Sequence, residues 1–134
     1  MEIDGACHCG AITYEANLDL KDVWICNCTD CQSLSGSAFR TIGLVPAERF
    51  RILSGKPRIY TKVGESGAPR VQAFCENCGS PIYAAAAVER PVTFNIRLGT
   101  CRQRESLVPT LQIWHRSALP WLSKLTEVPA KEKQ

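Results

Sequence analysis

The sequence has few of the features that mark membrane, secreted or nucleic-acid-binding chains. No stretch of its 134 residues approaches the roughly 20 consecutive apolar residues that a membrane-spanning helix needs. The first five residues, Met1 to Gly5, are acidic and lack the apolar core of a signal peptide. Lysine and arginine are spread along the chain without a long run, and the net charge is only +3. We therefore expect a soluble cytoplasmic protein that binds neither membranes nor nucleic acid.

The chain also lacks internal repeats, linkers and any helix of convincing length. Instead, short runs of β-branched and aromatic residues alternate with glycine- and proline-rich turns, a pattern typical of strands. The expected strands are 11–16, 23–25, 39–45, 51–53, 58–63, 70–74, 82–88, 92–98 and 111–115. A loop or one helical turn is expected at 32–37, one turn of helix at 46–50 and a short helix at 119–125, with a polar tail at 126–134. We predict one mainly β domain over residues 1–134, built of several short-stranded antiparallel sheets with metal knuckles at the strand ends.

Eight cysteines dominate the chemistry of the sequence. In a reducing compartment, clustered cysteines are metal ligands or catalysts more often than disulfides. Seven fall into three clusters and one stands alone. The clusters are Cys7 with Cys9, Cys26 with Cys28 and Cys31, and Cys75 with Cys78, while Cys101 is isolated.

The middle cluster has the spacing C-x-C-x-x-C. Thiols one residue apart do not easily meet the geometry of a disulfide, but they can point at a common metal ion. Three sulfur ligands suit Zn²⁺, and a zinc with three protein ligands keeps one position open for water or substrate. Cys26, Cys28 and Cys31 are therefore the candidate catalytic residues. The alternative is a closed structural site completed by Cys101 or His115.

The first and third clusters have the form of two zinc knuckles that are far apart in sequence. Cys7 and Cys9 together with Cys75 and Cys78 supply the four ligands that a structural zinc needs. Redox chemistry at Cys75-x-x-Cys78 is a weaker alternative, because no βαβ pattern surrounds that pair.

The other notable residues have ordinary explanations. We expect His8 to point away from the metal, Cys101 to pack as a small apolar side chain, and His115 to be packed on the face of a strand. Trp114 and Trp121 are expected in the core or in the wall of a groove. The basic residues of the strands form a solvated surface from which some could bind the carboxylates of a small acidic substrate. These residues are Arg51, Arg58, Lys62 and Arg70.

Three cysteine motifs and their neighbours resemble those of the glutathione-dependent formaldehyde-activating enzyme family, which also includes centromere protein V. The first motif is Gly5-x-Cys7-x-Cys9-Gly10, and the second is Cys26-Asn27-Cys28-x-x-Cys31-Gln32 followed by Ser35-Gly36-Ser37-Ala38-Phe39. The third is Phe74-Cys75-x-x-Cys78-Gly79-Ser80-Pro81-Ile82-Tyr83. The resemblance continues through Leu98-Gly99-Thr100 and Ile113-Trp114-x-x-Ser117-x-x-Pro120-Trp121. The chain departs from the family at Gln112, where members often carry a histidine, near Ala118, and at Cys101-Arg102.

The resemblance implies a zinc-binding β-tent fold with two zinc ions per chain. It places the structural zinc on the first and third clusters and the catalytic zinc on the middle one. The implied activity is that of a carbon–sulfur lyase, the formation of S-hydroxymethylglutathione from glutathione and formaldehyde, so the implied partners are a small thiol and a small aldehyde. The alternative is a zinc-stabilised binding module without turnover, whose ligand is a small thiol or a protein.

Overall fold

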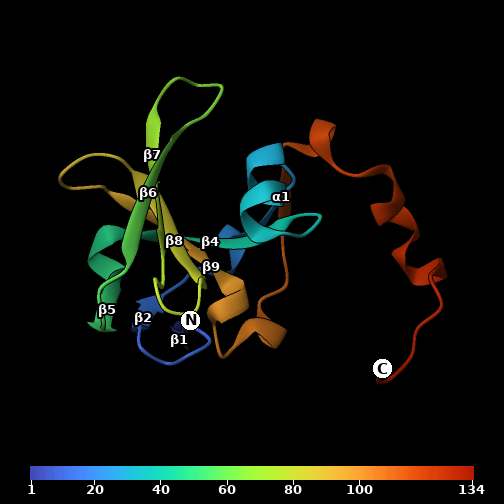
Figure 1. The fold of residues 1–134 in the computed structure, drawn as a ribbon, viewed down its shortest axis with the longest axis horizontal. Helices are drawn as coiled ribbons and strands as arrows, with labels where there is room; N and C mark the ends of the chain where they lie inside the picture. Colours follow the sequence, from blue (N-terminus) through green and yellow to red (C-terminus); the bar gives the residue numbers. More distant parts are fainter.

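The structure is a computed structural model that describes residues 1–134 (Figure 1). Ten β-strands in two sheets make up most of its regular secondary structure. The smaller sheet is antiparallel and has the order β1 (Glu2–Ala6), β2 (Thr13–Asn17), β5 (Phe50–Ser54). The larger sheet has the order β10, β3, β4, β9, β8, β7, β6. Its strands are β3 Val23–Cys26, β4 Arg40–Pro46, β6 Arg58–Val63, β7 Pro69–Phe74, β8 Pro81–Ala86, β9 Thr93–Arg97 and β10 Leu111–Ile113. The prediction of a mainly β protein is confirmed.

Helical structure is limited to one short α-helix and several 3₁₀ turns. The helix, α1, spans Thr29–Ser35 and ends at Gly36, whose φ of 64° lies in the left-handed region that glycine adopts readily. The 3₁₀ turns are η1 Leu20–Asp22, η2 Ala47–Arg49, η3 Leu98–Thr100, η4 Arg104–Ser106, η5 His115–Ser117 and η6 Pro120–Glu127. No helix is long and apolar enough to cross a membrane.

The two faces of the large sheet differ in chemistry because strand residues alternate between them. On one face, Val45 pairs with Phe94 and Ile96 pairs with Tyr83, and these side chains join the apolar core that includes residues of the small sheet. Phe50 of the small sheet lies 4.9 Å from Phe94 between ring centroids, so aromatic packing links the two sheets. The opposite face is polar around the buried side chains of Arg40, Gln72 and Arg97, and it carries Cys26 of the middle cysteine cluster.

Three local expectations were wrong. Strand β1 was not expected, because only Ile3 in the segment Glu2–Ala6 is a large apolar residue. Strand β10 pairs with β3 in parallel, although antiparallel pairing was expected. It also ends at Ile113, because Trp114 adopts a left-handed φ of 55° that breaks the extended backbone. His115 consequently lies in the exposed η5 turn instead of on a strand.

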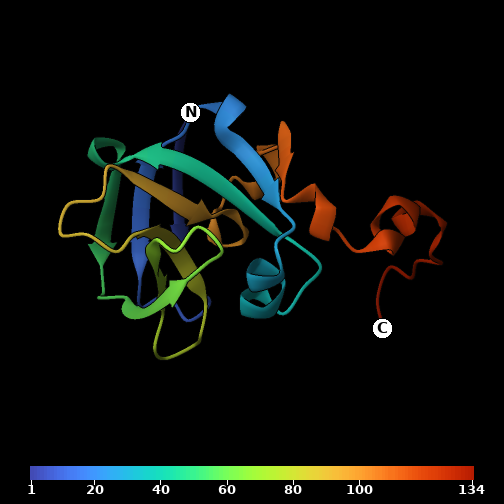
Figure 2. The ribbon, with the colours of Figure 1, turned by 90° about the horizontal axis from the view of Figure 1, so that it is seen from above.

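The C-terminal segment lies away from the two sheets in both orthogonal views (Figures 1 and 2). None of the residues in η6 is buried, and its backbone hydrogen bonds join only neighbouring residues of the same segment. Trp121, expected in the core or a groove, is half exposed here. The core and both cysteine groups therefore form without this segment.

Candidate metal centres

The first and third cysteine clusters meet in one group. Cys7 and Cys9 lie in the turn between β1 and β2, and Cys75 and Cys78 lie in the turn between β7 and β8. Both turns close on a glycine with positive φ, Gly10 at 80° and Gly79 at 76°, as a tight knuckle requires. All four sulfurs lie within 4.8 Å of one another. The structure thus joins two segments more than sixty residues apart at a common centre.

The spacing of these sulfurs fits a metal better than a disulfide. The Cys7 and Cys9 Sγ atoms are 3.5 Å apart, and the Cys9 and Cys75 Sγ atoms are 3.7 Å apart. A tetrahedral zinc–thiolate site has sulfurs roughly 3.8 Å apart, because each Zn–S bond is about 2.3 Å, whereas a disulfide bond is about 2.0 Å. A hydrogen bond from the Ser80 hydroxyl lowers the pKa of Cys78 to about 5, which favours the thiolate that a metal binds.

The middle cluster forms a separate group of three. Cys26 is the last residue of β3, Cys28 caps the N-terminus of α1, and Cys31 lies in the first turn of that helix. Their Sγ atoms lie within 4.8 Å of one another, and the Cys31 backbone N–H donates to the Cys28 Sγ at 3.2 Å. The end of a strand followed at once by a helix therefore directs three thiols to one point without a fourth protein ligand.

The side-chain amides of Asn27 and Gln32 hold this cluster in place by hydrogen bonds. Asn27 is fully buried between two of the cysteines, and its Nδ2 donates to Gln112 Oε1 at 3.2 Å. Gln32 Nε2 donates to the carbonyl oxygens of Asn27 and Ser117, each at 2.9 Å. These bonds tie the loop to β10 and η5, which explains physically why Asn27 and Gln32 belong to the motif.

The three thiols influence one another's protonation. A hydrogen bond from the Cys31 thiol lowers the pKa of Cys26, and that same hydrogen bond, followed by burial, raises the pKa of Cys31. Burial also raises the pKa of Cys28. Ionisation of Cys26 is thus favoured over that of its two neighbours, as expected for three sulfurs that are crowded together without a cation.

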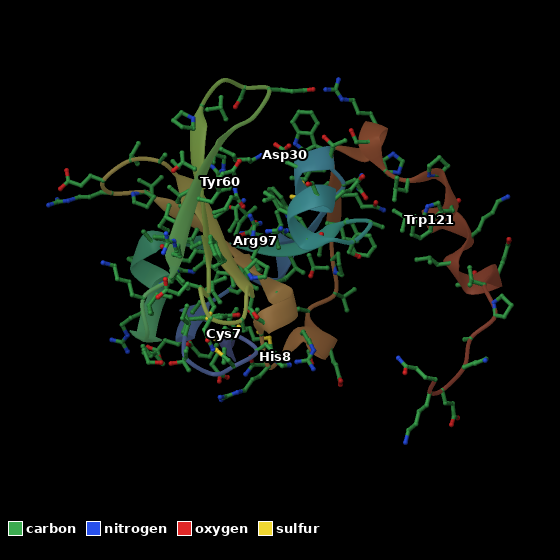
Figure 3. The ribbon with its side chains drawn as sticks, viewed as in Figure 1. Cys7, His8, Asp30, Tyr60, Arg97 and Trp121 are labelled. Atoms are coloured by element: carbon green, nitrogen blue, oxygen red, sulfur yellow. The ribbon has the colours of Figure 1, made fainter.

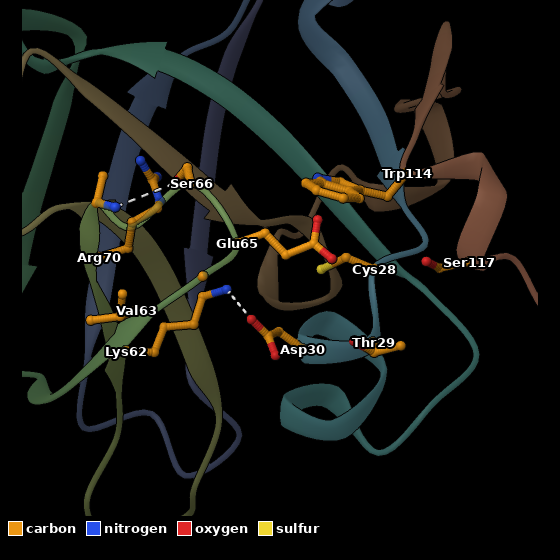
Figure 4. Close-up of a pocket in the computed structure, with 12 residues that line it drawn as sticks. Cys28, Thr29, Asp30, Lys62, Val63, Glu65, Ser66, Arg70, Trp114 and Ser117 are labelled. Carbon is orange, nitrogen blue, oxygen red and sulfur yellow. Dashed lines mark hydrogen bonds and ion pairs between the residues drawn. The ribbon is translucent and has the colours of Figure 1, made fainter.

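A pocket of about 420 Å³ opens beside the middle cluster (Figure 4). Cys28 and Trp114 line it together with the charged side chains of Asp30, Lys62, Glu65 and Arg70. The Lys62 Nζ is 2.5 Å from an Asp30 carboxylate oxygen, whereas Arg70 has no carboxylate partner. Trp114, expected in the core or in a groove wall, is therefore a pocket wall. The pocket therefore gives access to the cluster at Cys28.

The alternative ligands of the sequence analysis are not in either group. Cys101 is buried in the core and its thiol hydrogen-bonds to Gln103 Oε1 at 3.2 Å, as expected of a packed thiol. His115 is exposed, and so is His8. The division of seven cysteines into groups of four and three, drawn from spacing, is the arrangement that the structure brings together.

Sequence reasoning missed two buried arginines next to the three-cysteine group. Arg40 pairs with Cys26 across β3 and β4, and Arg97 pairs with Ile42 across β4 and β9. Both are 6% exposed. A lone arginine within a strand gives no signal of burial in the sequence, so only the strand register could have identified them.

Comparison with known proteins identifies the family of this chain. The family model for glutathione-dependent formaldehyde-activating enzymes matches residues 2–117. Since this range covers most of the chain, the protein belongs to that family, and the resemblance found in the three motifs is confirmed.

Two known proteins illustrate the relationship. A Colletotrichum graminicola protein named "Putative glutathione-dependent formaldehyde-activating enzyme" is 24% identical over 90 residues, which are 66% of this chain and 45% of that protein. The chain thus spans about half the length of this curated relative. A Rhodobacter sphaeroides protein of known crystal structure is 18% identical and has a TM-score of 0.62, with 81% of this chain and 98% of that chain covered. The similarity to the Rhodobacter sphaeroides protein shows a shared fold.

Proposed function

We propose that the protein is a zinc-dependent carbon–sulfur lyase-type enzyme that joins a small thiol such as glutathione to formaldehyde. One observation carries the proposal: three thiols converge beside a pocket of about 420 Å³ without a fourth protein ligand. A zinc bound by Cys26, Cys28 and Cys31 would keep one position open toward that pocket. Cys7, Cys9, Cys75 and Cys78 would hold a second zinc with a structural role, giving two per chain.

The proposed reaction forms a carbon–sulfur bond. The substrate sulfur adds to the carbonyl carbon of formaldehyde, the carbonyl π electrons move to oxygen, and the proton released by the thiol ends on that oxygen. The product is the S-hydroxymethyl thiol. Zinc, when bound, would supply the positive charge that lowers the pKa of the substrate thiol and polarises the carbonyl.

The chain's own residues bind and orient the substrate. Glutathione has two carboxylates, and Arg70 is the pocket cation that lacks a carboxylate partner, so we assign it the role of binding one of them. Lys62 lies beside it but is paired with Asp30. Of the other cations considered from the sequence, Arg51 is paired with Glu15 and Arg58 with Glu76, and neither lines the pocket.

Exchange NMR spectroscopy at equilibrium would test the proposal. Glutathione and formaldehyde combine without a catalyst, so the rate of exchange between free glutathione and its S-hydroxymethyl adduct must be compared with the protein-free rate. We expect the zinc-loaded protein to accelerate this exchange and the Cys28→Ser variant to return it to the protein-free rate. Cys101→Ser is the matched control, because Cys101 lies outside both groups. Its exchange rate should stay that of the parent, with circular dichroism confirming the fold.

The same measurement separates the proposal from its alternative. Stoichiometric glutathione binding at the Cys28 pocket without accelerated exchange would establish a binding module in place of an enzyme. Absence of both binding and acceleration in protein loaded with two zinc ions would reject a thiol–aldehyde reaction.

A further inference from the structure

The polar face of the large sheet holds two buried cations beside the three-cysteine group. Arg40 lies directly opposite Cys26 in the register of β3 and β4, so both side chains are on one face. Arg97 lies opposite Ile42, two residues along β4, and therefore shares that face. A cavity of about 150 Å³ is lined by Arg97 together with Cys26, Cys28 and Cys31. Figure 3 shows Arg97 between the sheet and α1.

Neither arginine has an acidic partner. Six ion pairs join side chains of the protein, and none of them includes Arg40 or Arg97. Arg97 donates one hydrogen bond, from Nη2 to Gln72 Oε1 at 2.7 Å. The Nε and Nη2 of Arg40 and the Nε of Arg97 are buried without a partner. Buried charges of this kind are normally paired, because removing them from water is costly.

The electrostatics of the pair point to missing negative charge. Burial and then the charge of Arg40 lower the pKa of Arg97 to about 9, and burial lowers the pKa of Arg40. The three cysteines are the potential source of negative charge that shares a cavity with Arg97. Lys62 is already neutralised by Asp30, so that carboxylate does not offset the arginines.

The net charge of the three-cysteine group with a bound divalent metal and an anionic fourth ligand would equal and oppose that of the two guanidinium groups. Three thiolates around one divalent cation leave a single net negative charge. A neutral fourth ligand would leave one arginine unbalanced, whereas an anionic fourth ligand would add the second negative charge. We propose that Arg40 and Arg97 balance the charge of the metal-loaded three-cysteine centre and thereby select an anion, such as a thiolate, as its fourth ligand. This inference rests on the proposed function, because it requires a divalent metal on Cys26, Cys28 and Cys31.

Cobalt substitution would test the selection of an anion. Co²⁺ takes the place of Zn²⁺, and the absorption bands of the three-cysteine site change when an external ligand occupies the fourth position. Titration with azide, an anion, and with imidazole, a neutral ligand, would be carried out on the parent, Arg40→Gln and Arg97→Gln. Arg51→Gln is the matched control, because it removes the same charge from the exposed surface of the small sheet.

We expect Arg40→Gln and Arg97→Gln to lose azide affinity but not imidazole affinity. The arginine variants should bind azide at least about tenfold more weakly and release the metal of the open site about tenfold more readily to a chromophoric chelator. Imidazole affinity and the metal of the four-cysteine site should not change, and the latter serves as an internal reference for folding. Arg51→Gln should behave as the parent. Arg97→Lys, which keeps the charge, should recover part of the azide affinity.

The outcomes separate this inference from the proposed function. Equal azide affinities in the parent and both glutamine variants would overturn the role of the arginines while leaving the metal centre intact. Failure of the parent to take up a metal at the three cysteines would reject the proposed function itself. Azide binding to metal-free parent that is abolished in Arg40→Gln would also overturn the inference, since the arginines would then form an anion site of their own.

Discussion

At the scale of single residues, Gly5 shows how closely the chain packs beside the first cysteine pair. A Cβ atom added at Gly5 would overlap the Tyr14 phenol group and lie 2.6 Å from the Thr100 carbonyl oxygen. Tyr14 is fully buried, and its hydroxyl group hydrogen-bonds to Thr100 Oγ1 at 3.0 Å, so it cannot move aside. Gly5 is therefore required by a close approach between β1, β2 and η3, and this accounts for the first glycine of the motif.

Gly5→Ala should consequently destabilise the protein. The overlap would force β1 away from Tyr14, at a cost of about 1–3 kcal/mol or more in the free energy of unfolding. Urea unfolding followed by fluorescence would measure the change. Gly99→Ala is the control, because a Cβ there meets no atom within 4 Å and the residue does not need a positive φ. Equal midpoints for Gly5→Ala and the parent would contradict the packing described here.

At the scale of elements, the four-cysteine group joins the turn between β1 and β2 to the turn between β7 and β8. The two turns belong to different sheets, so a metal there would link the two sheets. Such binding is coupled to folding, because the unfolded chain has no preformed site. The three-cysteine group instead joins β3 to α1, which are adjacent in sequence.

This difference predicts unlike effects of two cysteine variants. Cys75→Ser should yield unfolded or aggregated protein, whereas Cys28→Ser should lose one zinc and keep its far-ultraviolet circular dichroism spectrum. Metal analysis and circular dichroism of the same samples would show this. A Cys75→Ser protein that binds two zinc ions and melts like the parent would refute the structural role. Global unfolding of Cys28→Ser would show that the three-cysteine group is structural as well.

Some of these elements could be read from the sequence and others could not. Spacing favoured the division of the cysteines into groups of four and three, but it left open a closed middle site completed by Cys101 or His115, which the structure keeps out of both groups. Strand β9 was also predictable, because Phe94 and Ile96 alternate with polar residues. Strand β1 forms by pairing with β2, and no residue pattern marks the left-handed φ of Trp114. Arg40 and Arg97 are buried by strand register, which composition does not reveal.

At the scale of the whole molecule, the chain divides into a body and a C-terminal arm, residues 119–134. The body contains both sheets and both cysteine groups. Its last firm connections are the hydrogen bond from Gln32 Nε2 to the Ser117 carbonyl oxygen and the ion pair of 2.7 Å between Arg116 and Glu65. The arm exposes Trp121, Leu125 and Val128 and buries none of the residues in η6.

A chain that ends at Ala118 should therefore keep its fold and its metals. Removing residues of which none is fully buried, and whose backbone hydrogen bonds are local, should change the free energy of unfolding by less than about 1 kcal/mol. A chain that ends at Thr110 is the matched comparison, because it also loses β10, the parallel partner of β3, and Gln112, which holds Asn27 between the cysteines. It should melt at a clearly lower temperature and lose the metal of the three-cysteine group first. Thermal unfolding with metal analysis would distinguish the two truncations. If the chain ending at Ala118 also lost that metal, the arm would have to contact the pocket in solution, and the division into body and arm would be wrong.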